Sequence, residues 1–199
     1  MEIKDSISPF FTRQNLEIVL GSKRRTLDYR IKSLVKKGML APIKPGFFLN
    51  LSVYKNSSSP DELLCYVGNI LVPDSYVSLQ YTLSKYGILA EGVYSITFIT
   101  TRKTRKFLAG DISLTYKNIK SSLFCGFKSQ KIGDFVYQMA SPAKALFDYF
   151  YLAPAGAEKG DNRFNLNVLN FEDRQEFKDY VDKSGSPKMK KVLRYIYGQ

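Results

Sequence analysis

The fold is decided by residues 12–51, which read TRQNLEIVLGSKRRTLDYRIKSLVKKGMLAPIKPGFFLNL. Thr12 suits the N-cap of a helix, because its side-chain oxygen can accept a hydrogen bond from a free amide of the first turn. Apolar residues then recur at helical spacing up to Gly21, a residue type that tolerates the left-handed backbone found after a helix end. These residues predict a short helix over positions 13–20, followed by a tight turn.

A longer helix is predicted for residues 23–37, with Ser22 as its cap and Gly38 immediately after its end. Its apolar stripe consists of Leu27, Ile31, Leu34 and Val35. The other faces are strongly basic, and Asp28 is the only acid in these fifteen positions. Charge of one sign along a helix favours an anionic partner over a merely solvated face.

Two short β segments follow at residues 41–44 and 46–51, with Lys44, Pro45 and Gly46 forming the turn. Two helices joined by a tight turn and followed by a β-hairpin are the outline of a winged helix-turn-helix. In helix-turn-helix proteins the second helix lies in the major groove of DNA. We therefore predict a DNA-binding domain over residues 1–54.

The charge of the whole chain agrees with this prediction. Its 199 residues contain 30 Lys+Arg against 18 Asp+Glu, a formal net charge of +12. Residues 1–50 carry ten basic and four acidic side chains, which is half of that excess. Positive charge concentrated on a helix-turn-helix pattern indicates a nucleic-acid partner more strongly than a basic composition alone.

The N-terminal part of the second helix, residues 22–30, is expected to read base edges. Its arginines suit bidentate hydrogen bonds to guanine, and each such pair contributes about 1–3 kcal/mol of discrimination. Lysines from position 32 to 44 are expected to contact phosphates, which add affinity but little sequence information. The predicted DNA-contacting residues are Thr12, Arg13, Ser22, Lys23, Arg24, Arg25, Thr26, Tyr29, Arg30, Lys32, Lys36 and Lys44.

The Ser-rich stretch KNSSSP at residues 55–60 is the predicted boundary, so that the second domain covers residues 60–199. Helical patterns are found at residues 61–70, from about 74 to 85, and at 142–152, 171–183 and 187–197. Alternating, β-branched patterns are found at residues 92–101, 107–118, 123–130 and 131–139. The chain is therefore expected to be α+β, with a small, mostly antiparallel sheet and C-terminal helices.

A second basic cluster lies between two predicted strands. It consists of Arg102, Lys103, Arg105 and Lys106. A solvated hairpin tip explains such a cluster adequately. The functional interpretation is an auxiliary phosphate contact, which would steepen the salt dependence of DNA binding.

The composition excludes several kinds of site. The chain has no histidine, which removes Ser-His and Cys-His nucleophile pairs and the usual catalytic zinc ligand sets. Cys65 and Cys125 lie in apolar runs and are interpreted as small buried residues. No phosphate-binding glycine motif is present, and we expect neither a cofactor nor a metal site. Without an apolar run of 18 residues or a signal peptide, the chain is expected to be cytoplasmic, with no membrane partner.

Several motifs occur in an order that resembles the AbiEi family of transcriptional regulators, the antitoxins of type IV toxin–antitoxin and abortive-infection loci. The winged-helix pattern ends in GFFLNL at residues 46–51 and is followed by YVSLQYTLSKYGIL at 76–89. A strand ITFITT, a basic turn and FLAGDISLTYKNI come next, and ASPAKALFDYFYL at 140–152 closes the pattern. The resemblance covers roughly residues 10–155 and rests on the order of individually weak motifs.

The resemblance implies that the N-terminal winged helix binds inverted repeats in the protein's own promoter and represses the operon. It also implies that the second domain neutralises a cognate nucleotidyltransferase-like toxin, with no general need for direct contact. The matching reader positions are residues 22–30 and the wing around Lys44. The matching second-domain positions are Tyr76, Ser78, Tyr81, Leu83, Gly87, Ser141, Pro142, Lys144, Ala145, Leu146 and Asp148. The chain departs from the family pattern before Pro9, where it has room for only a turn or two of the usual first helix.

Two alternatives belong to other classes of function. Aromatic residues, 14 Tyr and 14 Phe, permit a protein-interaction module that binds a toxin partner directly. Scattered acids permit a metal-dependent nuclease, although their spacing matches no metal-binding pattern. These acids are Glu62, Asp74, Glu91, Asp111, Asp134 and Asp148.

Overall fold

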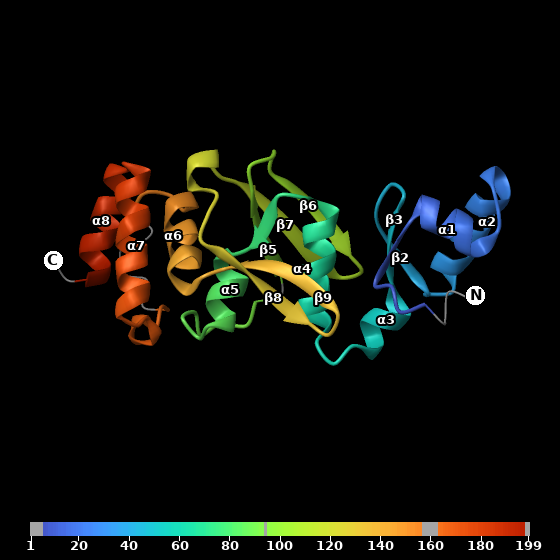
Figure 1. Cartoon of the computed structure of the whole chain (residues 1–199), viewed down its shortest axis with the longest axis horizontal. Coiled ribbons are helices and arrows are strands. Elements are labelled where there is room, and N and C mark those ends of the chain that lie inside the picture. The colour runs from blue at the N-terminus through green and yellow to red at the C-terminus, as the bar shows by residue number, and fades with distance from the viewer. Residues whose placement is uncertain (1–5, 94, 157–162, 198–199) are drawn as a thin grey trace.

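A computed structural model of the chain describes residues 6–93, 95–156 and 163–197. Its elements follow one another along an elongated molecule, with α1 and α2 at one end and α8 at the other (Figure 1). The helices are α1 (Arg13–Leu20), α2 (Arg24–Lys36), α3 (Leu51–Asn56), α4 (Pro60–Leu71), α5 (Leu79–Lys85), α6 (Pro142–Leu152), α7 (Phe171–Ser184) and α8 (Pro187–Tyr197). The strands are β1 (Phe10–Thr12), β2 (Leu40–Lys44), β3 (Phe47–Asn50), β4 (Ser75–Val77), β5 (Ser95–Thr100), β6 (Arg105–Ala109), β7 (Ile112–Asn118), β8 (Phe127–Ile132) and β9 (Phe135–Ala140).

The α+β class is confirmed. Within the described residues, none of the helices combines the length and the apolar character that crossing a bilayer requires.

The first two helices form where the sequence predicted them. The side chain of Thr12 accepts a hydrogen bond from the Asn15 amide and caps α1, which ends at Gly21 in a left-handed conformation with φ 57°. After α2, the amide of Gly38 donates to the Val35 carbonyl and that of Met39 to the Leu34 carbonyl. This pair of hydrogen bonds is a Schellman motif, which requires the positive φ of 65° that glycine adopts readily.

The cap expected at Ser22 is wrong. Lys23 is the N-cap residue of α2 and makes no side-chain capping bond. Ser22 is buried, and its hydroxyl donates to the Leu20 carbonyl at 3.0 Å. The Ser22 side chain therefore points back toward α1 and hydrogen-bonds to a carbonyl at the end of that helix, instead of capping the start of α2.

The small N-terminal sheet has the order β1-β3-β2 and is antiparallel throughout. The segment before α1 contributes strand β1, which pairs Phe10 with Leu49 and Thr12 with Phe47. No strand was predicted from the sequence at this position, between Pro9 and the start of α1. The third strand converts a two-stranded hairpin, which is marginal alone, into a sheet with a buried apolar face.

The larger sheet corrects the expectation of a small one, although three of its five neighbouring pairs are antiparallel. It has six strands in the order β6-β7-β5-β4-β9-β8. Two of its neighbouring pairs, β5 with β7 and β4 with β9, are parallel, so the sheet is mixed. The β8–β9 hairpin was readable from its local turn, whereas the parallel pairs join strands that are distant in sequence.

The helix expected between positions 74 and 85 is also partly wrong. Ser75–Val77 is strand β4, which pairs with β5 on one side and with β9 on the other. Asp74 has φ 58°, a left-handed conformation, and the chain enters strand β4 directly after it. Helix α5 begins only at Leu79, after the strand has entered the middle of the sheet.

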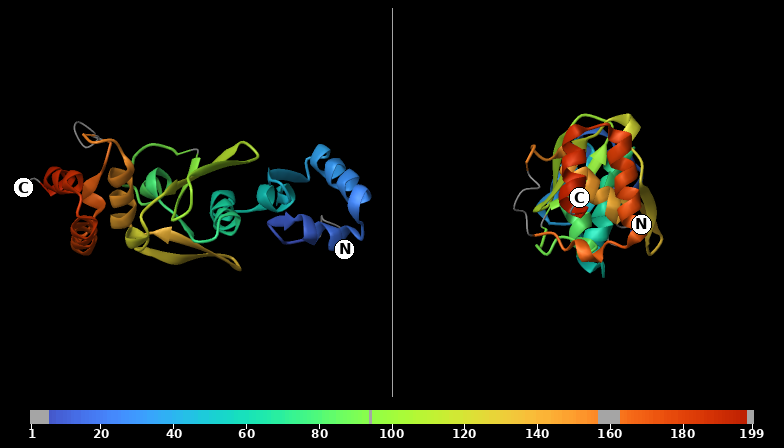
Figure 2. Two further views of the ribbon diagram at one scale, coloured as in Figure 1. Left: turned by 90° about the horizontal axis from the view of Figure 1, so that it is seen from above. Right: turned by 90° about the vertical axis from the view of Figure 1, so that its left-hand side faces the viewer.

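The two faces of the six-stranded sheet pack against different partners. Phe98 and Tyr116 lie on the face covered by α4, and their rings stack with centroids 4.7 Å apart. Ile99 lies on the opposite face, where α5 and α6 pack and where α7 and α8 complete the cluster. Figure 2 shows these C-terminal helices gathered at one end of the sheet.

The residues that carry the family resemblance meet in a buried polar cluster on this second face. The Lys144 ammonium lies 2.6 Å from one carboxylate oxygen of Asp148, and both side chains are fully buried. The other oxygen accepts hydrogen bonds from the hydroxyls of Ser78 at 2.8 Å and Tyr76 at 3.0 Å. Burial raises the pKa of Asp148, and the ammonium with the two hydroxyl donors opposes part of that rise.

The two cysteines have different surroundings. Cys65 is buried within α4, and burial raises the pKa of its thiol to about 12. Cys125 is only half-buried, and the Lys183 ammonium lies 3.5 Å from its sulfur. The expectation of a small buried residue is therefore confirmed for Cys65 and is wrong for Cys125.

Candidate nucleic-acid interface

Helix α2 presents one continuous stripe to solvent. Arg25, Tyr29, Lys32 and Lys36 follow one another at spacings of four, three and four residues, so they share one face. Leu27 and Ile31 lie on the other side of the helix and are buried against α1 and β2. Tyr29 is 75% exposed although it is a large aromatic residue. The stripe is thus free to meet a partner along its whole length.

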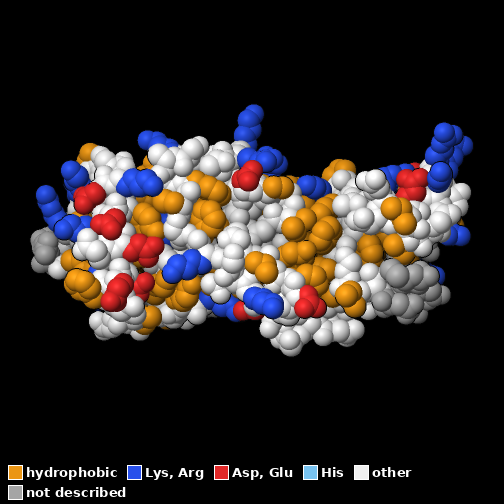
Figure 3. Space-filling view, in the orientation of Figure 1, with side chains coloured by type: hydrophobic (Ala, Val, Ile, Leu, Met, Phe, Trp, Pro, Cys, Tyr) orange, Lys and Arg blue, Asp and Glu red, His pale blue; other side chains and the backbone are white. Residues whose placement is uncertain are grey.

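The basic side chains of this helix are not neutralised within the molecule. Among the described residues, no hydrogen-bond or salt-bridge partner contacts the side chains of Lys23, Arg24, Arg25, Lys32 or Lys36. In the space-filling view, Lys and Arg side chains project from the end of the molecule that α2 forms (Figure 3). An unpaired row of positive charges on a projecting helix attracts a polyanion.

Asp28, the only acid of α2, is compensated from α1. The Arg13 guanidinium donates a hydrogen bond to its carboxylate. This hydrogen bond lowers the pKa of Asp28, and the nearby charge of Lys32 lowers it further. Arg13 is therefore engaged with α2, and the negative charge of Asp28 does not oppose an approaching phosphate in full.

Arg24 begins α2 in an unusual conformation. Its φ is 49°, a left-handed value that non-glycine residues rarely adopt. The strain places an exposed arginine at the N-terminal end of the helix, where backbone amides are unpaired and the helix dipole is positive.

Four of the predicted contacts have other roles within the fold. Thr12 is engaged as the cap of α1, and Ser22 is buried in the turn. The Arg30 guanidinium donates to the Leu20 carbonyl at 2.6 Å and so holds the end of α1. Lys44 does not stand free at the tip of a wing, because its ammonium donates to the Leu71 carbonyl at 3.0 Å, at the end of α4.

The β2–β3 hairpin, predicted to be a wing, is docked on the rest of the molecule. Ala41, Ile43, Phe47 and Leu49 of the small sheet belong to the same buried cluster as the residues of α4 and the six-stranded sheet. An aromatic series continues this contact: Phe10 stacks on Phe47 at 4.8 Å, and Tyr66 of α4 stacks on Phe135 of β9 at 4.8 Å. Figure 1 shows the small sheet between helices α1 and α2 and the larger sheet.

The second basic cluster lies on the turn between β5 and β6 and is exposed. Arg102 is ion-paired with Asp74 at 3.0 Å, which compensates its charge. The guanidinium of Arg105 donates to the Lys103 carbonyl, and the Lys106 side chain is exposed on β6. In Figure 3, basic side chains also project from the upper edge over the sheet, the same edge toward which those over α2 project.

The acids considered for a nuclease site do not come together. Glu62 pairs with Lys85, Asp74 with Arg102, Glu91 with Arg163, and Asp148 with Lys144. Asp111 and Asp134 are exposed, in the turns of two hairpins. Within the described residues, no group of three or more Cys, Asp or Glu side chains is placed to hold a metal ion.

Some of the predicted DNA-contacting residues thus share one exposed surface on α2. Others, such as Ser22, Arg30 and Lys44, make hydrogen bonds within the fold instead. The sequence predictions did not group Arg25, Tyr29, Lys32 and Lys36 as one surface, although their spacing of four, three and four residues indicates a shared helix face. No protein-family profile matches the chain, and no curated protein sequence matches it.

Proposed function

We propose that the chain is a sequence-specific DNA-binding repressor whose N-terminal part acts as a winged helix-turn-helix. The observation that carries this proposal is the exposed stripe of Arg25, Tyr29, Lys32 and Lys36 on a projecting helix. In this role, Arg25 near the N-terminal end of the helix contacts guanine edges in the major groove. Lys32 and Lys36, farther along, contact phosphates.

Other residues of the same end complete the proposed interface. Lys23, Arg24 and Thr26 lie at the start of α2 with exposed side chains and reach the adjacent backbone or base edges. Lys103, Arg105 and Lys106, which are exposed in the β5–β6 turn and at the start of β6, are auxiliary phosphate contacts. The proposed interface excludes Lys44, Ser22, Thr12, Arg30 and Arg13, because each of these side chains is engaged within the protein.

The regulatory role is proposed from the family resemblance. The chain acts as the antitoxin of a type IV toxin–antitoxin operon, and it binds inverted repeats in its own promoter. The order of motifs supports this proposal, and their residues Tyr76, Ser78, Lys144 and Asp148 form one buried cluster, as a pattern that specifies a fold should. A cognate nucleotidyltransferase-like toxin is the functional partner.

DNA binding is tested by mobility shifts at about 150–200 mM salt, a range in which nonspecific phosphate contacts are weakened. We expect Arg25→Ala to lower affinity for the DNA upstream of the protein's own gene about 10-fold or more, and affinity for scrambled DNA far less. Lys36→Ala should weaken both duplexes alike and reduce the salt slope by about one. Lys191→Ala, an exposed lysine on α8 at the other end of the molecule, is the matched control and should change neither.

Two results would contradict this interface. One is equal affinity of the unaltered protein for promoter and scrambled DNA. The other is an identical loss with Arg25→Ala and Lys191→Ala.

The antitoxin role is tested by expressing the chain together with the neighbouring gene of its operon. We expect the chain to restore growth that the neighbouring product arrests. Arg25→Ala should retain this protection when both genes are expressed from foreign promoters, because neutralisation is assigned to the second domain. Growth arrest that persists with the intact chain would remove the antitoxin role and leave DNA binding untouched.

A further inference from the structure

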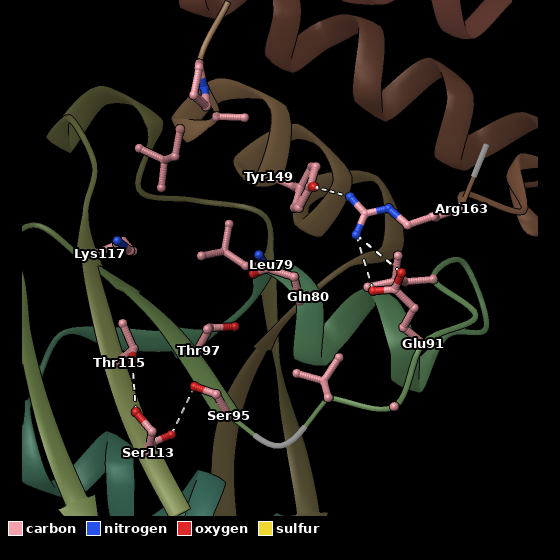
Figure 4. Close-up of a pocket in the computed structure, with 16 residues that line it drawn as sticks. Leu79, Gln80, Glu91, Ser95, Thr97, Ser113, Thr115, Lys117, Tyr149 and Arg163 are labelled. Carbon is pink, nitrogen blue, oxygen red and sulfur yellow. Dashed lines mark hydrogen bonds and ion pairs between the residues drawn. The ribbon is translucent and has the colours of Figure 1, made fainter. Parts of the chain in front are cut away.

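A groove of about 850 Å³ lies on the six-stranded sheet, away from the DNA-binding end. Its floor is the face of β5 and β7 that α4 does not cover, and α5 and α6 contribute residues to it (Figure 4). Parallel strand pairs are usually covered on both faces and are apolar on both. On the face away from α4, the parallel pair β5–β7 is apolar only at Ile99 and carries polar side chains at its other register positions. This departure calls for a reason other than core packing.

The floor carries a ladder of hydroxyl groups. Ser95 is the register partner of Ser113, and Thr97 is the partner of Thr115, so the four side chains lie on one face. The Ser113 and Thr115 hydroxyl oxygens are 3.2 Å apart. Thr97 donates to the Ser78 carbonyl, and Ser95 donates to the Ser113 carbonyl. Because each hydroxyl oxygen can also accept hydrogen bonds, the ladder presents acceptors to the groove.

The two sides of the groove differ in charge. Lys117 lies two residues beyond Thr115 on β7, is exposed and lines the groove. On the other side, the Arg163 guanidinium pairs with Glu91 at 3.2 Å and also donates to the Tyr149 hydroxyl at 3.2 Å. Figure 4 shows Lys117 at the left of the groove, above Thr115, and the Arg163 group at the right, with Leu79 and Gln80 between them. The net positive charge is therefore at the Lys117 side.

Apolar side chains line part of the remaining wall. Leu79 and Leu89 are buried there, and Val93 and the ring of Tyr149 are half-buried. A ligand suited to the groove needs an anionic end, a middle rich in hydroxyl groups and a flat apolar end. The volume lies within the range of small-molecule sites, about 300–1,000 Å³.

We propose that this groove binds a nucleoside phosphate. The phosphates lie at Lys117, the sugar lies over the hydroxyl ladder, and the base lies against Tyr149 and the leucines. The site is distinct from the DNA interface and does not depend on the proposed repressor function. It gives the second domain a small-molecule ligand of its own.

The test is isothermal titration calorimetry of the full chain with ATP, adenosine and inorganic pyrophosphate as separate probes. We expect saturable binding of one ATP per chain, with adenosine and pyrophosphate each about 10-fold weaker or more, because each lacks one part of the recognised molecule. The ATP concentration should reach a few millimolar, so that weak binding is also detected. Lack of saturable ATP binding over this range would overturn the proposal. Pyrophosphate binding as tight as that of ATP would also overturn the proposal, because the site would then recognise the negative charge and neither the sugar nor the base.

Variants separate the groove from the other basic surfaces. Lys117→Ala should weaken ATP binding about 10-fold, since it removes a charged hydrogen-bond donor. Thr115→Val, which keeps the side-chain shape and removes one hydroxyl, should weaken it about 3-fold or more. Lys128→Ala, an exposed strand lysine on β8 at the opposite edge of the sheet, should leave it unchanged.

Arg25→Ala distinguishes this site from the DNA interface. We expect it to retain ATP binding, and we expect Lys117→Ala to retain promoter binding. ATP binding that is lost with Arg25→Ala and retained with Lys117→Ala would place the nucleotide on α2 and overturn the proposed groove.

Discussion

Replacing Lys144 by methionine is expected to lower the free energy of unfolding by about 3–5 kcal/mol. The reason is the buried carboxylate of Asp148, which would lose the ammonium 2.6 Å away and remain in a site that water does not reach. The ammonium also lies 4.8 Å from the ring centroid of Phe147 and 5.2 Å from that of Tyr180, so these contacts are lost as well. Urea unfolding followed by circular dichroism measures the change.

The double variant Lys144→Met/Asp148→Asn shows whether the unpaired charge is the cause. Asparagine removes the negative charge and keeps an oxygen that accepts from Ser78 and Tyr76. We expect the free energy of unfolding of the double variant to be at least about 1 kcal/mol higher than that of Lys144→Met alone. The matched control is Lys85→Met, which breaks a partly exposed pair with Glu62 and should cost less than about 1 kcal/mol. If Lys144→Met costs no more than Lys85→Met, the cluster is not important for stability.

Replacing Gly68 by alanine is expected to destabilise the chain by about 2 kcal/mol or more, although alanine is the better helix former. A Cβ atom at this position in α4 would lie 2.2 Å from Cζ of the Phe98 ring. That ring is fully buried and stacked on Tyr116, whose hydroxyl donates to the Gly68 carbonyl at 2.8 Å. The helix and the sheet must therefore separate, or the ring must leave its stacked position.

A double-mutant cycle checks this mechanism. Phe98→Leu provides space for the methyl group, so Gly68→Ala should cost less in the Phe98→Leu background than in the native one. The control is Gly92→Ala, since a Cβ there meets no atom within 4 Å; its effect should stay within about 0.5 kcal/mol. A Gly68→Ala variant as stable as the native chain would show that α4 is not held at the distance described here.

Local signals in the sequence predicted most elements correctly. Thr12, Ser141 and Asn170 each cap a helix through a side-chain hydrogen bond, and Gly21 ends one in a left-handed conformation. The β8–β9 hairpin followed from alternating residues around Gly133, and the strand pattern at residues 107–118 covers most of β6 and β7 without dividing them. These features depend on contacts between residues only a few positions apart, which is why the sequence shows them directly.

The candidate interface was predictable only in part. Exposed positive charge along α2 followed from the buried stripe on its other side. The roles of Ser22, Arg30 and Lys44 could not be predicted from that stripe, because each side chain donates a hydrogen bond to a carbonyl outside α2. For Lys44 that carbonyl belongs to Leu71, 27 residues away, and no local pattern indicates such a partner.

By itself the sequence determined the α+β class, the caps at Thr12, Ser141 and Asn170, the periods of the helices, the basic second helix and the order of the motifs. Only the tertiary structure decided that β4 enters the middle of a mixed sheet, that the β2–β3 hairpin docks on α4, and that a hydroxyl ladder forms the floor of a groove. It also brought Tyr76 to Asp148 across 72 positions. The physical reason is range: caps and periodicity act within a few residues, whereas strand order and buried charge pairs depend on which distant surfaces exclude water together.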